Sequence, residues 1–315
     1  MLKDNHELDD LFSFEKNEKN LIAKAKQKST IRMVFISGLV SLLVLTLIIL
    51  VKLQVTPWLL NKELIAQETY YEVHGANSFI GPWEESIQII GSKATAPQYK
   101  LLDGRPVYLG EISNNSDKIE VHLTPNEYET YSYLGGKVMN FIHPEVKLNH
   151  VPNELKNIDM FQDHQLIEMG LSFDKAYSLD EVKAMLPKDI ALQWAWVDVY
   201  SVEEVNSLQT SEPPANIFTE NEVFGFSLVD KTGIRLKDPV KEFMDSVVYG
   251  KNHMGPYKRD MATFYETLTE QGEVDETNIK VIGSVVVGKK VALKQLQNES
   301  GVRASSIGAV VDSFK

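Results

Sequence analysis

One run of nineteen uncharged residues constrains this chain more than any other feature. Residues 33–51 read MVFISGLVSLLVLTLIILV, and fourteen of them are Leu, Ile, Val or Phe. As an α-helix with a rise of 1.5 Å per residue, the run is about 28 Å long, close to the thickness of the hydrocarbon layer of a membrane. A polar face would favour a core helix of a soluble domain, and the run has none. It therefore predicts one transmembrane helix that lies in the lipid bilayer.

The basic residues around this run predict its orientation. Residues 16–32 contain six Lys or Arg, whereas the comparable window after the run contains only Lys52 and Lys62. Because cytoplasmic flanks carry the excess of basic residues, we expect the N-terminus in the cytoplasm. A cleavable signal peptide would have a shorter apolar stretch and a small-x-small cleavage site after it. Here 32 residues precede the run and KLQVTPWLLNKEL follows it, so the run is predicted to be a signal anchor in the cell membrane.

Composition excludes several classes of site and partner. The chain of 315 residues contains no Cys, which rules out thiol catalysis, disulfides, and zinc or iron–sulfur sites held by Cys. Residues 1–51 carry seven Lys or Arg against six Asp or Glu, a net charge of +1. Residues 52–315 carry 25 against 38, a net charge of −13. An acidic outer part argues against direct contact with nucleic acid and is repelled by anionic lipid headgroups.

The first 32 residues carry an amphipathic helical pattern that is too short to bury a core of its own. Such a helix normally buries its apolar stripe against a partner, here on the cytoplasmic side. A helix lying on the inner leaflet, with Lys24, Lys26 and Lys28 at the headgroups, is the alternative. If a protein partner binds there, we expect its apolar anchors to be Leu8, Leu11, Phe12, Leu21 and Ile22.

The predicted fold class is α+β, with a short cytoplasmic helix and one transmembrane helix before an outer region that mixes strands and helices. Short β-type runs alternate with turn signals from about Glu68 to Leu123, with turns at Asp103-Gly104 and at residues 114–116. A looser stretch with two prolines follows. The predicted parts are a tail at 1–32, a transmembrane helix at 33–51, a membrane-proximal β-rich module at 52–142, a linker at 143–157 and a C-terminal α+β domain at 158–315.

The C-terminal domain shows the clearest elements. The pattern predicts a strand at 165–173, a helix at 178–186 capped by Ser178 and closed by Pro187, and a strand at 190–200. A variable loop with Pro213 and Pro214 leads to predicted helices at 238–250 and 255–272. A strand at 278–288, a helix at 289–299 and a strand at 303–314 complete the domain. Two β-α-β units, one at each end, predict a sandwich with helices packed on one sheet.

No motif identifies catalytic residues, a metal site or a cofactor. Residues 283–290, GSVVVGKK, nearly match a phosphate-binding loop, but three valines favour a strand and Lys290 stands where a hydroxyl is needed. The pair SFDK at 172–175 and KTG at 231–233 lacks the third element of the penicillin-binding pattern. The seven His residues show no metal-ligand spacing. The stripe of Trp194, Trp196 and Tyr200 has the spacing of one sheet face and is expected in the core.

Several segments together resemble a known family. They are KAKQKSTIRMVFIS at the start of the membrane span, ATAPQYKLLDGRPVYLGE in the β-rich segment, LSFDKAYSLDEVKAML followed by ALQWAWVD, and IKVIGSVVVGKKVALKQLQNESGVRASSIGAVV near the end. Over residues 11–110 and 155–312 the chain resembles the membrane-bound sigma factor regulators, or anti-sigma factors, of Firmicutes such as bacilli, with their N-terminal and C-terminal regulator domains.

The resemblance implies a binding protein and not an enzyme. The tail would hold an extracytoplasmic-function sigma factor at the membrane and keep it from RNA polymerase, and the outer domain would sense the state of the envelope during stress. Two other readings stay open. The chain could be a signal-anchored envelope module that binds an envelope ligand or a second membrane protein and has no sigma partner. It could also be an anchored enzyme that assembles a site from distant residues such as Asp163, His164 and Glu168.

Overall fold

The computed structural model describes residues 4–88, 91–114, 122–126, 128–253, 255–270 and 272–313. The chain divides into two compact units, residues 1–59 and residues 60–315. The first helix, α1 (Asp4–Val73), is 70 residues long and begins in the first unit. Within the first unit the apolar side chains of residues 33–51 are exposed, as Phe35 at 74% and Leu47 at 62% illustrate. An exposed apolar surface of this extent is typical of a segment that contacts lipid or another protein.

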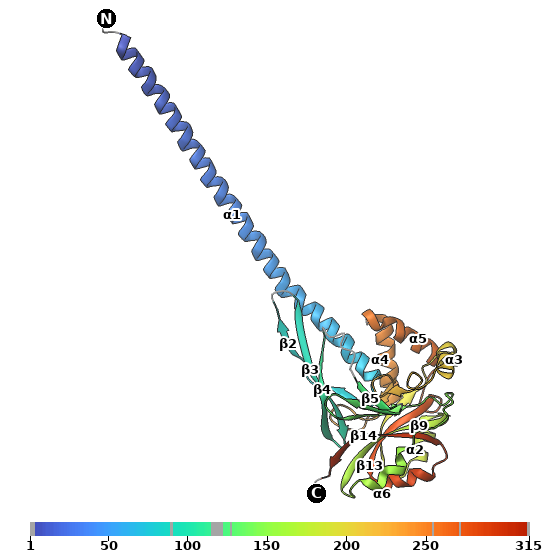
Figure 1. The fold of residues 1–315 in the computed structure, drawn as a ribbon. Helices are drawn as coiled ribbons and strands as arrows, with labels where there is room; N and C mark the ends of the chain where they lie inside the picture. The colour runs from blue at the N-terminus through green and yellow to red at the C-terminus, as the bar shows by residue number, and fades with distance from the viewer. Residues whose placement is uncertain are drawn as a thin grey trace. The chain divides into compact units, whose positions relative to one another are not determined.

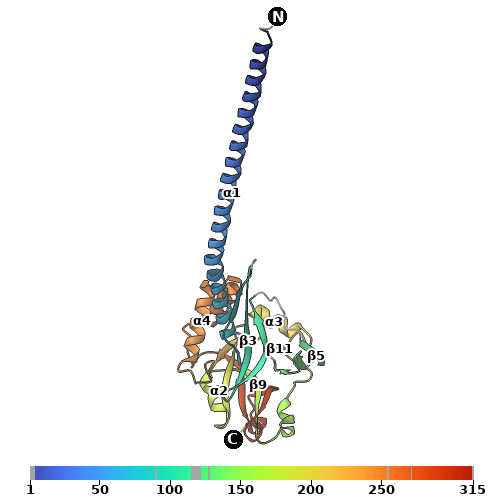
Figure 2. The same ribbon diagram turned by 90° about the vertical axis from the view of Figure 1, so that its left-hand side faces the viewer.

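The last turns of α1 belong to the second unit, where they are part of its core. Leu60, Leu64 and Val73 are buried, and the first two pack with Ala94 of strand β3. Both views show β3 beside this end of α1 (Figures 1 and 2). The prediction of β structure from about Glu68 is therefore wrong at its start, since helix continues to Val73. An apolar stripe that extends past the uncharged run and packs on a sheet keeps this segment helical.

A four-stranded antiparallel sheet follows α1. In it β3 (Ser92–Leu102) pairs with β1 (Ser78–Ile80), β2 (Glu84–Ile87) and β4 (Arg105–Ser113). Asp103 and Gly104 both have positive φ, 52° and 75°, and turn β3 into β4, which confirms the predicted turn. The second predicted turn, at 114–116, lies largely outside the described residues. Two smaller sheets join β5 (His122–Asn126), β6 (Glu129–Ser132) and β7 (Lys137–Val138), and β8 (Asn140–Phe141) with β11 (Phe218–Thr219).

The largest sheet has five strands in the order β12-β10-β13-β9-β14, all antiparallel to their neighbours. Its strands are β9 (Gln165–Tyr177), β10 (Ala191–Val197), β12 (Gly225–Ser227), β13 (Val281–Lys289) and β14 (Val302–Asp312). Strands β9 and β10 run parallel with β13 between them, and β13 and β14 run parallel with β9 between them. Helix α2 (Leu179–Met185) connects the first pair, and α6 (Lys290–Leu293) with the 3₁₀ helix η3 (Lys294–Asn298) connects the second.

This order is that of two interleaved split β-α-β units, the ferredoxin-like arrangement, with β12 added at one edge. The predicted α+β class and both β-α-β units are thus confirmed. The predicted helix over 289–299 is divided into the short α6 and η3, so its helical structure is less regular than expected. Ser178 caps α2 as predicted: its side chain accepts from the Glu181 amide while the Glu181 side chain accepts from the Ser178 amide.

Among its described residues, the segment between β10 and β13 holds three α-helices. Helices α4 (Pro239–His253) and α5 (Lys258–Thr269) confirm the two predicted ones, and a 3₁₀ turn, η2 (Gly255–Tyr257), precedes α5. Helix α3 (Val202–Thr210) lies where the sequence predicts only a loop. None of its residues is fully buried, although Leu208 packs against a buried cluster. Ser201 and Glu204 form a capping box that could have revealed the helix.

The core of the second unit covers both faces of the large sheet. On one face Ile167, Met169 and Leu171 of β9 pack with Leu179 of α2 and Leu293 of α6. A further 3₁₀ helix, η1 (Glu154–Met160), adds Leu155 and Ile158 to this cluster, and α4 and α5 extend it. On the other face Trp194 and Trp196 pack with Met139 and Phe141. Residues 60–315 form one compact unit. The division into a β-rich module at 52–142, a linker at 143–157 and a C-terminal domain at 158–315 stays a prediction.

Candidate functional site

The five residues predicted to contact a partner all belong to helix α1. Leu8, Leu11 and Phe12 lie in its first turns, and their side chains lie outside the described residues. Leu21 and Ile22 are described, and their side chains are 68% and 60% exposed. Two adjacent large apolar residues at such exposure are available to a partner or to a lipid surface.

The continuity of α1 separates these positions by direction. At about 100° per residue, positions 8, 11, 12 and 22 fall within an arc of about 100° around the helix, whereas position 21 lies about 140° from position 8 and about 80° outside that arc. A partner that binds one face of the helix would therefore contact Ile22 and not Leu21. This pair offers a test in which two neighbouring residues of similar size should behave differently.

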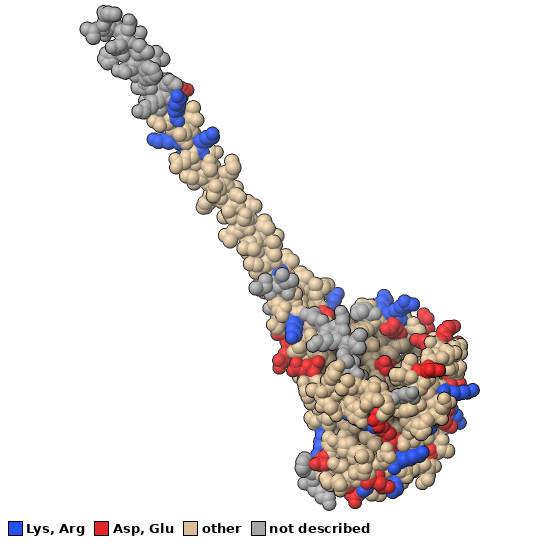
Figure 3. Space-filling model, in the orientation of Figure 1, with Lys and Arg blue, Asp and Glu red and all other residues tan. Residues whose placement is uncertain are grey.

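The uncharged run is the second feature of α1 that the sequence singles out. In the part of the chain that the structure describes, it forms the one helix long and apolar enough to cross a membrane, and none of its most apolar window is buried. Figure 3 shows the run as a stretch of α1 without charge, with Lys and Arg side chains on its N-terminal side. An exposed run differs in this respect from the core helix of a soluble protein, which would be covered.

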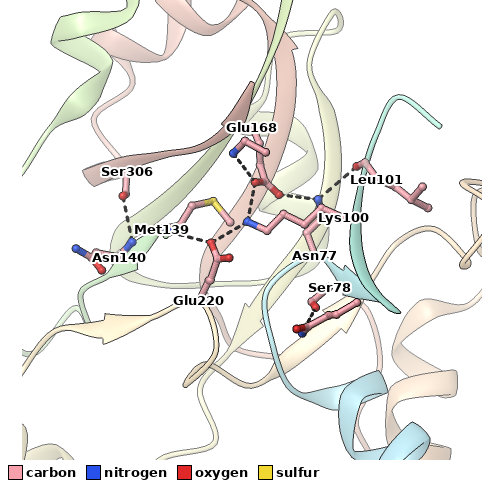
Figure 4. Close-up of polar contacts among 11 residues, drawn as sticks. Asn77, Ser78, Lys100, Leu101, Met139, Asn140, Glu168, Glu220 and Ser306 are labelled. Carbon is pink, nitrogen blue, oxygen red and sulfur yellow. Dashed lines mark hydrogen bonds and ion pairs between the residues drawn. The ribbon is translucent and has the colours of Figure 1, made fainter. Parts of the chain in front are cut away.

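A buried ionic cluster joins three distant segments of the second unit (Figure 4). The Lys100 ammonium on β3 lies 2.8 Å from Glu168 Oε2 on β9 and 2.7 Å from Glu220 Oε2 after β11. The three side chains are 1%, 0% and 5% exposed. Asn77 donates to Glu168 Oε1 at 2.7 Å, and the Met139 amide donates to Glu220 Oε2 at 2.8 Å. The cluster ties β3 to the large sheet.

Burial and neighbouring charges shift the pKa values of Lys100 and Glu220 in this cluster. Burial alone would lower the pKa of Lys100, but the charges of Glu168 and Glu220 outweigh it and raise that pKa. Burial raises the pKa of Glu220, and Lys100 opposes the rise. With two carboxylates and one ammonium, the cluster is held by its single cation. The three groups are enclosed and bond to one another, to Asn77 and to the Met139 amide. The arrangement is therefore suited to holding the fold together and not to acting on a substrate.

The residues suggested for an assembled enzyme site do not come together. Asp163 is 78% exposed and pairs with Lys290 at 2.6 Å, and His164 lies 3.3 Å from Asp312 at the end of β14. Glu168 is instead fully buried in the ionic cluster. The three side chains therefore serve separate contacts. Among the described residues no group of three or more His, Asp or Glu is placed to hold a metal ion.

The remaining sequence motifs are structural. Residues 283–288 of the near-match to a phosphate loop lie inside strand β13, which confirms the predicted strand. The hydroxyl of Ser172 is buried on β9 and accepts from the Ile142 amide at 3.0 Å. Trp194 and Trp196 are 2% and 0% exposed in the core, as predicted, and Trp196 donates to the Tyr200 hydroxyl at 3.2 Å.

A cavity of about 400 Å³ opens in the second unit among segments that the sequence does not link. It is lined by the last turns of α1, by β1, by the residues around β12 and by α4. Its walls include Tyr71, Ser78, Trp194 and Phe226. Sequence reasoning missed this cavity and the ionic cluster alike. For the cluster one signal was available, because Ala94, Ala96, Gln98 and Lys100 alternate along β3 and all face inward.

Comparison with known families gives one match. Residues 158–309 match the family model described as sigma factor regulator C-terminal. The matched segment begins just before β9 and ends within β14, so it includes both split β-α-β units and the helices between them. No curated protein and no solved structure gives a significant match to the chain. The match supports the resemblance to sigma factor regulators, whose role is regulatory and implies a sigma factor as partner.

Proposed function

We propose that this chain is a single-pass membrane anti-sigma factor. Its cytoplasmic tail holds an extracytoplasmic-function sigma factor at the membrane, and its outer domain senses the state of the envelope. The observation that carries the proposal is the match of residues 158–309 to the C-terminal domain of sigma factor regulators. The resemblance of residues 11–110 to the same regulators, in the order in which their parts occur, extends the proposal to the tail and the membrane span.

The topology rests on the uncharged run and its flanks. The run is exposed along α1 and six Lys or Arg precede it within residues 16–32, which favours an N-terminus in the cytoplasm. The natural absence of Cys makes a direct test simple. A single cysteine introduced by Ser300→Cys should react with a membrane-impermeant maleimide on intact cells, and one introduced by Ser13→Cys should react only after lysis. The reverse pattern would overturn the orientation.

Capture of a partner tests the function. The full chain in mild detergent should retain a sigma factor that is absent from captures with a version lacking residues 2–31, with partners identified by mass spectrometry. The double variant Leu11→Asp/Phe12→Asp should lose the partner. Ile22→Asp should weaken capture strongly, because a charge would enter the apolar contact, whereas Leu21→Asp should not, since that position faces elsewhere on the helix.

Two results would contradict this proposal. If the variants at positions 11 and 12 retain the sigma factor, these residues are not its anchors. If the full and the truncated chains capture the same wall or membrane proteins and no sigma factor, the function belongs to the outer domain alone. The chain would then be a signal-anchored envelope module, for which deletion of the tail leaves the output unchanged.

A further inference from the structure

The cavity of the second unit combines an apolar floor with an acidic rim. Trp194, Phe226 and Phe243 are 2 to 3% exposed and form part of its floor. At the mouth stand the side chains of Glu72 on α1 and Glu242 on α4, both exposed. A volume of about 400 Å³ lies within the range of small-molecule sites in proteins. The cavity can therefore enclose one apolar group of moderate size.

The charge of the lining is strongly one-sided. Five carboxylates line the cavity against one ammonium, that of Lys231. No Lys or Arg in the described part of the chain forms an ion pair with any of the five carboxylates. Three of them accept hydrogen bonds from neutral groups: Glu68 from Trp83 at 3.1 Å, Glu72 from Ser246 at 2.8 Å, and Asp230 from the Thr232 hydroxyl at 2.7 Å. Asp230 also accepts from the backbone amides of Thr232 and Ile234. A concave site lined by one sign of charge concentrates ligands of the opposite sign. The five carboxylates are those of Glu68, Glu72, Asp230, Glu242 and Asp245.

We infer that this cavity binds an amphipathic organic cation, a ligand with an apolar body and a protonated amine. The apolar body would be enclosed by the aromatic floor, and the amine would lie among the rim carboxylates. The inference deepens the proposed sensing role of the outer domain and rests on it. The site is suited to that role because Glu68, Tyr71 and Glu72 are in the last turns of α1, the same helix that contains the uncharged run.

A set of three probes with one common body separates charge from apolar fit. The full chain in phosphatidylcholine nanodiscs is titrated with 1-naphthylmethylamine, 1-naphthalenemethanol and 1-naphthoate, and binding is followed by saturation-transfer NMR of the probes. We expect the amine to bind most tightly, the alcohol more weakly and the carboxylate not at all. Affinity for the amine should fall with added salt while affinity for the alcohol should not. Equal binding of all three probes would overturn the inference.

Charge-removing variants locate the site. The double variant Glu72→Gln/Glu242→Gln keeps side-chain size and should lower affinity for the amine by about two- to thirtyfold, the range for two exposed charge pairs. Its affinity for the alcohol should not change. The matched control Glu203→Gln/Glu212→Gln removes the same charge from exposed positions outside the cavity and should bind the amine as the natural chain does. If the two double variants bind the amine equally, the amine does not occupy this cavity.

The probe assay contains no sigma factor, so its outcome does not depend on whether the proposed anti-sigma function is correct. Capture of a sigma factor by a chain that binds no amine would overturn the ligand and leave the anti-sigma role intact. Amine binding by a chain that captures no sigma factor would support the cavity as a binding site and overturn the regulatory role.

Discussion

Replacing Lys100 with Met removes the only cation of the buried cluster and keeps the length of the side chain. Glu168 and Glu220 then remain without a counter-charge in a region where both side chains are at most 5% exposed. Hydrogen bonds from Asn77 to Glu168 and from the Met139 amide to Glu220 persist, so the two carboxylates keep part of their stabilisation.

The expected loss in the free energy of unfolding is about 3–5 kcal/mol at pH 7.5, as for other buried ion pairs from which one partner is removed. Against a typical total of about 5–15 kcal/mol, the variant should still fold. The loss should shrink as the pH falls. Burial already raises the pKa of Glu220 and Lys100 opposes that rise. Without Lys100 this pKa rises further, so the folded state takes up a proton more readily than the unfolded state and is stabilised toward acid pH.

Urea unfolding of the full chain in non-ionic detergent, followed by tryptophan fluorescence, measures this loss, because Trp194 and Trp196 are buried in the second unit. The matched control is Lys294→Met, which breaks an exposed pair with Asp159 and should cost less than about 1 kcal/mol. A loss below 1 kcal/mol for Lys100→Met, or a loss that does not depend on pH, would refute the reasoning.

Two further predictions concern groups enclosed in the second unit. Burial lowers the pKa of His74 to about 3. In the unfolded state the imidazole has its ordinary pKa of about 6.5 and takes up a proton as the pH falls below that value, whereas in the folded state it stays neutral. Lowering the pH from 7 to 5 should therefore reduce the free energy of unfolding of the natural chain by about 2 kcal/mol more than that of His74→Phe. Urea midpoints of both proteins at the two pH values test this, and an equal pH dependence would contradict it. Gly308→Ala should destabilise by about 1–3 kcal/mol, because a Cβ there would overlap Glu168 Oε2 and the Met139 sulfur. Thermal unfolding checks this change, and an unchanged melting temperature would show that the cluster can move aside.

Local signals predicted most of the elements correctly. The alternation along 165–173 gave strand β9, and Ser178 with Glu181 marked the start of α2. Helices α4 and α5 of the 198–280 segment were predicted from the sequence. Helix α3 was not predicted; it is short and none of its side chains is fully buried. The extent of α1 was underestimated, since its last turns are held by packing on β3 and not by local composition.

The sequence by itself determined a long uncharged helix, its basic N-terminal flank and two β-α-β units, because each depends on periodicity or charge within one short segment. It also supplied the five tail residues, whose role stays a prediction. Only the tertiary structure decided the order of the strands, the cluster of Lys100, Glu168 and Glu220, and the acidic cavity. These features join residues up to about 170 positions apart, and a contact of that kind exists only once the sheets have paired and buried their side chains.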